Sequence, residues 1–127
     1  MTPTVAALYV ATVISATDGD TVKLRTPWVD TPFAIMSIRI NGVDTPESRY
    51  PLAKCREELE AGKQATAFAR AAMPPGTVIR FGLTGHDKYG RLLGPVILPD
   101  GADYGSALIG QGLARPYNGG KKSSWCP

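Results

Sequence analysis

Cysteine and histidine are scarce in this 127-residue sequence. It contains two Cys and one His, so a scaffold held by many disulfides is excluded, and so are structural zinc sites, which need four Cys or His ligands. Long apolar runs are also absent. The longest, Val5–Ile14, contains Tyr and Thr and falls well short of the ~20 residues of a membrane-spanning helix. No Lys or Arg precedes that run, so we do not expect it to be a secretory signal.

The composition is that of a soluble globular protein. Hydrophobic residues make up 43% and charged residues 20% of the sequence, which is too apolar for a disordered chain. We expect one domain over residues 1–127, because this length is ordinary for a single folding unit. Fourteen basic and eleven acidic residues give a net charge of +3. This balance permits a polyanionic partner without demonstrating one.

Hydrophobic alternation and turn residues divide the sequence into strands and helices. The segments expected as strands are Val5–Ala16, Thr21–Leu24, Phe33–Ile40, Thr77–Leu83 and Leu92–Leu98, with a hairpin tip from Pro27 to Pro32. The segments expected as helices are Ala53–Met73, which ends at Pro74-Pro75-Gly76, and Tyr104–Gln111, which is closed by Gly112. Residues 115–127 are expected to form an irregular strap. The order predicts an α+β fold, a five-stranded barrel of the oligonucleotide/oligosaccharide-binding (OB) type with two to three helices. Another α+β sheet remains open on the pattern alone.

Acidic and basic residues are concentrated in three segments in a way that a fold does not require. The segments are Asp18–Val22, Arg39–Glu47 and Asp87–Arg91. Each has an ordinary structural interpretation when it is taken alone. The first suits a turn and the third a charged hairpin. Within the second, Asp44–Glu47 suits the entry of a helix, with Pro in its first turn.

In this order and spacing, the three segments resemble the staphylococcal nuclease family. Arg39 and Asp44 are five residues apart, Asp44 and Glu47 are three apart, and the third segment follows a helix and a strand. The resemblance covers nearly the whole chain and includes Gly110–Ala114. It is closest to small bacterial and phage-type members, which have a Cys before the helix and a Tyr-Asn-Gly-Gly-basic-Trp-Cys tail.

The resemblance implies a site for one Ca²⁺. Asp20 and Asp44 would supply carboxylates and Thr45 its backbone carbonyl, which leaves positions for water and a phosphate oxygen. Ca²⁺ accepts such oxygen ligands in a flexible shell, whereas Mg²⁺ prefers a rigid octahedron, so Ca²⁺ is expected to serve better. Asp18 is expected to shape its turn rather than to bind the metal.

The resemblance also implies a nuclease that hydrolyses DNA and RNA with little sequence preference and leaves 3′-phosphate ends. Glu47 would orient or deprotonate the attacking water. Arg39 and Arg91 would hold the phosphate, because a guanidinium is always charged and matches two phosphate oxygens at once. We expect a monomer that acts on single-stranded or frayed nucleic acid, with no membrane and no obligate protein partner.

Residues outside this catalytic set have less specific patterns. Lys88 and Tyr89 resemble the family's contacts to a neighbouring phosphate, although a solvated hairpin tip is the alternative, and Tyr117 is expected to stack on a base. The tail departs from the best-known members, which have two alternating Tyr residues and then a long helix. The remaining polar and aromatic residues are expected to be solvated or to pack: His86, Lys121, Lys122, Trp28 and Trp125.

Cys55 and Cys126 are expected to form a disulfide, because a tail without a helix of its own needs a tether. Closing a loop of about seventy residues would stabilise the fold by roughly 4 kcal/mol in the chain-entropy model. Such a bond persists in an oxidising compartment and would favour the periplasm or the exterior. Two unpaired thiols are the alternative.

Two functions of other classes compete with the nuclease. A non-catalytic module that binds nucleic acid or protein has no need of all of Asp20, Arg39, Asp44, Glu47 and Arg91, so their presence disfavours it. A carbohydrate-binding barrel would leave two Arg and three carboxylates unexplained.

Overall fold

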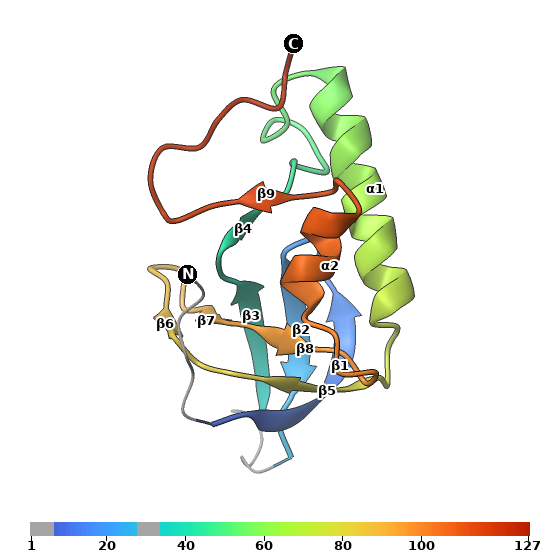
Figure 1. The fold of residues 1–127 in the computed structure, drawn as a ribbon, viewed down its shortest axis with the longest axis vertical. Helices are drawn as coiled ribbons and strands as arrows, with labels where there is room; N and C mark the ends of the chain where they lie inside the picture. The colour runs from blue at the N-terminus through green and yellow to red at the C-terminus, as the bar shows by residue number, and fades with distance from the viewer. Residues whose placement is uncertain (1–6, 28–33) are drawn as a thin grey trace.

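The computed structural model describes residues 7–27 and 34–127, and its main feature is a curved sheet flanked by helices (Figure 1). Seven strands form the sheet in the order β6-β7-β3-β2-β1-β5-β8, and two more form the separate pair β4-β9. The strands of the sheet are β1 (Tyr9–Ala16), β2 (Thr21–Arg25), β3 (Ile35–Ile40), β5 (Val78–Phe81), β6 (Gly85–His86), β7 (Leu92–Gly94) and β8 (Val96–Ile97). The separate pair is β4 (Val43–Asp44) and β9 (Arg115–Pro116), and the helices are α1 (Arg56–Ala72) and α2 (Tyr104–Gly110).

Pro95 closes the sheet into a barrel. Only this residue separates β7 from β8. Strand β7 nevertheless pairs in parallel with β3 near one end of the strand order, and β8 pairs with β5 at the other end. The chain crosses over tightly here, because a Cβ at Gly94 would lie 1.7 Å from the carbonyl oxygen of Gly82. The expected OB-type α+β fold is therefore confirmed. The single strand predicted over Leu92–Leu98 is wrong, since Pro95 has no N–H to continue a ladder.

The remaining strand predictions fall on the correct segments; β1, β3 and β5 are shorter than predicted, and β2 is one residue longer. Strands β1, β2, β3 and β5 lie where alternation predicts them, but β4, β6 and β9 are two residues long, too short to leave a periodic signal. Most of the predicted hairpin tip, together with Phe33 and Trp28, lies outside the described residues.

Helix α1 begins after Cys55, whose extended backbone and sulfur atom cap it; the sulfur accepts a hydrogen bond from the Glu58 N–H. The helix therefore starts three residues later than predicted. It ends before Pro74, which cannot continue a helix. Ala65 and Ala69 are fully buried along one side, as the predicted apolar stripe requires.

Helix α2 contacts the turn of the β1–β2 hairpin through its first residue. The Asp103 side chain caps it by accepting from the Gly105 N–H at 3.2 Å. Tyr104 is fully buried, and its hydroxyl donates to the Gly19 carbonyl at 2.7 Å. Tyr104 belongs to one core cluster with the other largest fully buried side chains, which are Phe81, Leu24, Ile38, Ile40, Met73, Ile79 and Leu108.

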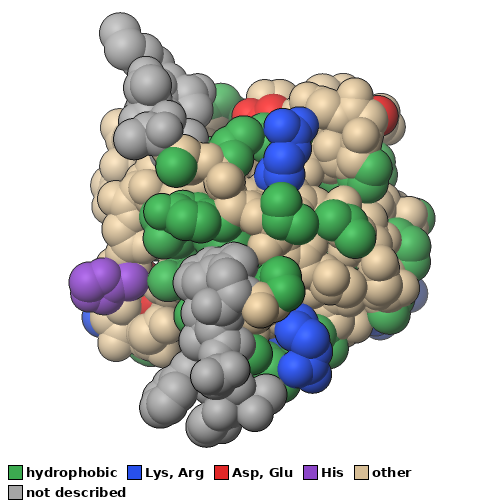
Figure 2. Space-filling view, turned by 90° about the horizontal axis from the view of Figure 1, so that it is seen from below, with side chains coloured by type: hydrophobic (Ala, Val, Ile, Leu, Met, Phe, Trp, Pro, Cys, Tyr) green, Lys and Arg blue, Asp and Glu red, His purple; other side chains and the backbone are tan. Residues whose placement is uncertain are grey.

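Figure 2 shows a face on which apolar side chains outnumber charged ones and acidic side chains lie at the margin. Large apolar residues exposed on the strands include Val10 of β1, Ile35 of β3 and Val78 of β5. The acidic segments of the sequence are gathered elsewhere, around the β1–β2 turn and the residues that follow β4.

Candidate active site

The turn Asp18-Gly19-Asp20 joins β1 to β2 and is held from several sides. Inside it, the Asp20 N–H donates to Asp18 Oδ1 at 3.1 Å. From outside, Tyr104 binds the Gly19 carbonyl, and a Cβ at Gly19 would lie 2.9 Å from the Ala65 Cβ of helix α1. Asp18 therefore shapes the turn, as the sequence predicts, and the position of Asp20 is fixed by the fold.

A hydroxyl joins this turn to the segment after β4. Thr45 Oγ1 donates to Asp20 Oδ2 at 3.1 Å, and the Thr21 hydroxyl donates to Asp20 Oδ1 at 3.1 Å. Asp44 and Thr45 are both buried. The residues predicted to hold the metal thus come together from two segments that are distant in sequence.

Arg39 lies against the same carboxylate, at the end of β3. Its NH2 atom is 3.5 Å from Asp20 Oδ2 and donates to the Val43 carbonyl at 3.3 Å, while NH1 donates to the Ile40 carbonyl at 3.1 Å. The pairing of Thr21 with Arg39 across β2 and β3 sets this contact. Arg39 is consequently positioned by backbone oxygens as well as by charge.

Arg91 reaches the site from the hairpin between β6 and β7. Its Nε donates to Asp87 Oδ2 at 2.7 Å and its NH1 to the Thr21 hydroxyl at 3.3 Å. Burial raises the pKa of Asp87, but hydrogen bonds from Arg91 and from the Tyr89 N–H outweigh it, so the pKa lies below its ordinary value. Asp87 was not assigned a separate role from the sequence, and the structure shows that it orients Arg91.

Burial and neighbouring carboxylates raise the pKa of two residues of the acidic segments, Asp18 and Glu47. Burial, and then Asp20, raises the pKa of Asp18 to about 7. Burial also raises the pKa of Glu47. The charges of Asp20, Glu58 and Asp44 raise it further, and the charge of Lys122 lowers it. Burial and nearby negative charge therefore disfavour the ionised forms of Asp18 and Glu47, and a bound cation would oppose this effect.

The C-terminal strap covers Asp44 with basic and aromatic side chains. Lys122 Nζ lies 3.3 Å from Asp44 Oδ1, while Arg115 Nε lies 3.9 Å and Trp125 Nε1 3.1 Å from Oδ2. Arg115 also stacks on Trp125, with its guanidinium carbon 3.6 Å from the ring centroid. Lys122 is exposed, as expected for a solvated tail, with 47% of its side chain accessible, and its ammonium group also pairs with the buried Asp44 carboxylate. Trp125 packs as expected and hydrogen-bonds as well.

The strap is fixed at its far end by the disulfide expected between Cys55 and Cys126, whose Cα atoms are 6.0 Å apart. At its near end, β9 pairs with β4, so that Arg115 lies opposite Asp44. The three groups around Asp44 could not be predicted from the sequence, because they come from residues 71 to 81 positions away. The two Cys residues were the one signal in the sequence that the C-terminal strap packs back onto the rest of the fold.

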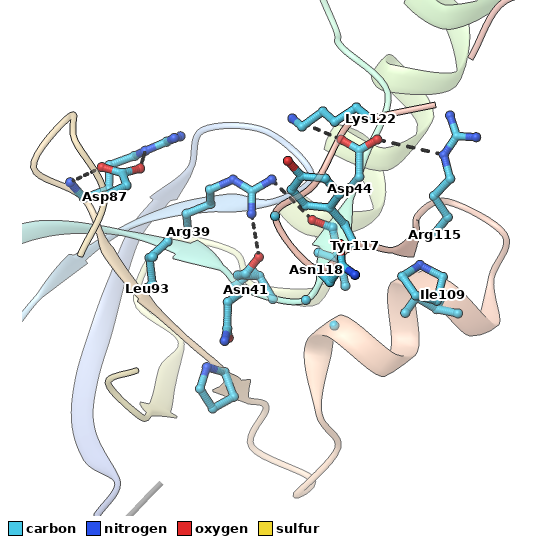
Figure 3. Close-up of a pocket in the computed structure, with 18 of the residues that line it drawn as sticks. Arg39, Asn41, Asp44, Asp87, Leu93, Ile109, Arg115, Tyr117, Asn118 and Lys122 are labelled. Carbon is cyan, nitrogen blue, oxygen red and sulfur yellow. Dashed lines mark hydrogen bonds and ion pairs between the residues drawn. The ribbon is translucent and has the colours of Figure 1, made fainter. Parts of the chain in front are cut away.

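A groove of about 1360 Å³ runs beside these residues. Its lining includes Arg39, Asp44, Lys88, Tyr89 and Arg91, together with the strap (Figure 3). Tyr89 is 73% exposed, and Lys88 and His86 are exposed too.

The remaining substrate-binding candidate, Tyr117, is half-buried, and its hydroxyl donates to the Gly120 carbonyl at 2.7 Å. The predicted catalytic and substrate-binding residues other than Glu47 therefore border one groove. Glu47 borders a neighbouring hollow with Asp18.

Comparison with known proteins identifies the family. Residues 37–124 match the family described as "Staphylococcal nuclease homologue". The chain belongs to the staphylococcal nuclease family. The matched residues contain Arg39, Asp44, Glu47 and Arg91, whereas Asp20 precedes them.

A relative extends the similarity to nearly the whole chain. "Endonuclease YhcR" of Bacillus subtilis (strain 168) is 32% identical over 119 residues, which are 91% of this chain and 9% of that protein. The chain thus spans about a tenth of its relative's length. Across residues 7–27 and 34–127, no helix is long and apolar enough to cross a membrane.

The donor atoms suit a hard divalent cation. Among the described residues there is no group of three or more His, Cys, Asp or Glu side chains that could hold a metal. Asp20 and Asp44 nevertheless offer carboxylate oxygens next to Thr45, whose hydroxyl contacts Asp20 and which follows Asp44 in the chain. Two carboxylates and a carbonyl suit Ca²⁺, which tolerates an irregular shell completed by water.

Proposed function

We propose that the chain is a Ca²⁺-dependent nuclease that hydrolyses phosphodiester bonds of DNA and RNA with little sequence preference. The observation that carries the proposal is the contact of Asp20 with both Thr45 and Arg39. It unites the two acidic segments and a phosphate-binding guanidinium at one end of the barrel. The name of the Bacillus subtilis relative supports the reaction class.

Asp20, Asp44 and the Thr45 carbonyl would hold one Ca²⁺. When bound, Ca²⁺ supplies positive charge that stabilises the phosphoryl oxygens and the nearby water. Asp44 would exchange Lys122 for the ion, since the Lys122 side chain is 47% exposed and can turn toward solvent.

The side chains divide the remaining chemistry between them. Glu47 accepts the proton of the attacking water, whose oxygen bonds to phosphorus as the bond to the 5′ oxygen breaks. The leaving oxygen takes up a proton, and the phosphate stays on the 3′ end. Arg39 and Arg91 hold the phosphoryl oxygens, and Asp87 fixes the plane of the Arg91 guanidinium through Nε.

The groove accounts for the substrate class. Lys88 would contact the next phosphate, while Tyr89 and Tyr117 would contact unstacked bases. An open groove lined by Lys88, Tyr89 and Tyr117 suits a single or frayed strand in which bases are free to stack. The Cys55–Cys126 disulfide favours a periplasmic or secreted location.

Digestion of single-stranded DNA tests the proposal. The protein should cut the strand in Ca²⁺, more slowly in Mg²⁺, and not at all after EDTA. A kinase that phosphorylates only free 5′ hydroxyls should label the products directly. Cleavage that survives EDTA would eliminate the metal mechanism, and 5′-phosphate products would contradict the proposed bond.

One observation favours the non-catalytic alternative. Lys122 and Arg115 already neutralise Asp44, as they would in a module that binds nucleic acid without a metal. Binding of the same strand without cleavage, unchanged between Ca²⁺ and EDTA, would establish that alternative.

A further inference from the structure

Glu58 is a buried carboxylate without a basic partner. It lies in the first turn of helix α1 and is 6% exposed. Within the described part of the chain its oxygens form no ion pair, and they accept hydrogen bonds from two backbone N–H groups instead. These are Lys54 N at 2.9 Å and Glu47 N at 3.2 Å. Burying a charged group costs free energy unless it is hydrogen-bonded, so both oxygens are committed to these two amides.

This arrangement goes beyond the capping of a helix. In a capping box, the acidic side chain at this position returns to the N–H of the capping residue, here Cys55. Glu58 reaches past that residue to Lys54, and with its second oxygen to Glu47, eleven positions before it. The helix gains little from that second bond. The second bond instead stabilises the position of the segment that contains Glu47.

Helix α1 meets the other side of Glu47 at Gly62. A Cβ built at Gly62 would lie 2.1 Å from the Glu47 carbonyl oxygen and 2.7 Å from the Ser48 nitrogen. Only glycine permits this approach of two backbones. The N–H of Glu47 is therefore bound by Glu58, and its carbonyl rests directly on the helix.

We infer that Glu58 is a positioning residue for Glu47, and that Gly62 provides the surface against which Glu58 holds it. The inference rests on the proposed function, in which Glu47 accepts a proton. Because helix α1 fixes the backbone of Glu47 on both sides, rotation about the side-chain bonds of Glu47 is enough to bring its carboxylate to the attacking water. Misplacement of a reacting group by about 1 Å can cost ~10²-fold in rate.

The test replaces Glu58 by Gln and compares it with Glu57→Gln, which removes the same charge from an exposed neighbour. The amide that replaces the Glu58 carboxylate has an NH2 donor where one of the two oxygens stood, so one of the two N–H groups then faces a donor instead of an acceptor. We expect Glu58→Gln to lower kcat by ~10- to 10²-fold with little change in KM, and Glu57→Gln to leave both unchanged. Amide hydrogen exchange at Glu47 should speed up in Glu58→Gln alone.

A double variant separates positioning from general destabilisation. In the Glu47→Gln background, Glu58→Gln should cause no further loss of kcat, because its effect passes through Glu47. Losses that multiply, or full kcat in a folded Glu58→Gln protein, would overturn the inference. If Glu58→Gln does not fold, Gly62→Ala takes its place, with Gly110→Ala as control, since a Cβ at Gly110 meets nothing within 4 Å. Normal turnover of Gly62→Ala would then overturn it.

Failure of the proposed function gives a different result. If the wild-type protein does not hydrolyse nucleic acid, or if Glu47→Gln is fully active, the nuclease assignment of Glu47 fails whatever Glu58 does. Amide exchange at Glu47 then decides the geometric part of the inference. Exchange unaltered by Glu58→Gln would overturn that part as well.

Discussion

The two ends of the Asp44–Glu47 segment are supported in opposite ways. Asp44 is surrounded by cationic and aromatic side chains of the C-terminal strap, a segment that has no helix or strand beyond β9. Glu47 is held through its backbone by the rigid helix α1. The first support can be exchanged, because long side chains can leave the carboxylate. The second cannot move without moving the helix. This difference suits a metal ligand at one end and a proton acceptor at the other.

The largest expected effect concerns the end that helix α1 supports. Glu47→Gln keeps the size of the side chain and removes its ability to accept a proton, so turnover should fall by ~10²- to 10⁴-fold. Nucleotide binding in Ca²⁺ should change little, since Asp20 and Asp44 remain. Turnover and binding are to be measured on one preparation, with thermal melting to confirm the fold. Loss of both would make Glu47 part of the metal site and abolish the contrast between the two ends.

The next effect concerns the tether of the strap. Cys126→Ser removes the disulfide while Cys55 still caps helix α1. Its 71-residue separation gives an expected loss of roughly 4 kcal/mol in unfolding free energy, measurable by urea denaturation. The NMR signal of the Trp125 indole N–H should shift as its bond to Asp44 loosens, while exchange at the Glu47 amide should stay slow in mild conditions. Faster amide exchange at Glu47 together with a shifted Trp125 signal would show that the two ends of the Asp44–Glu47 segment are not supported independently.

Arg91 serves as a comparison for both ends of the Asp44–Glu47 segment, because its side chain is held by Asp87 and not by the strap or by helix α1. Arg91→Ala should reduce turnover by at least ~10²-fold, the cost of losing one preorganised charge at the transition state. Lys88→Ala, at the exposed hairpin tip, should mainly raise KM. Steady-state kinetics distinguish the two. Near-normal kcat with a raised KM in Arg91→Ala would place Arg91 in binding rather than in chemistry.

The smallest effect is expected from a single contact at the Asp44 end. Trp125→Phe keeps a ring for Arg115 to stack on and removes the N–H that Asp44 accepts. Loss of a partner that orients a metal-binding carboxylate should weaken Ca²⁺ binding by ~10-fold, as titration calorimetry can show. Unchanged affinity would mean that the strap shields Asp44 without orienting it.

The sequence predicts the fold where the pattern is long. Strands β1 to β3 and both helices follow from alternation, caps and prolines, and the order of the elements predicts the barrel. The sequence could not predict the pairing of β4 with β9, because strands of two residues are too short to show a hydrophobic period. It also did not predict that Pro95 divides the last predicted strand. In the site, Asp20, Asp44 and Arg39 follow from the resemblance. The strap around Asp44 and the role of Glu58 do not, because an Asp44–Lys122 contact depends on tertiary closure and a helical Glu is ordinarily solvated.

The closure at Pro95 also bears on how the protein behaves in a crowded solution. In the described sheet the two outermost strands, β6 and β8, are only two residues long. Exposed strand edges act as templates for intermolecular strand pairing, and short edges present few free N–H and C=O groups. A barrel closed at Pro95 therefore offers neighbouring copies little backbone to pair with. The same crossover that shapes the barrel also protects it against edge-to-edge aggregation.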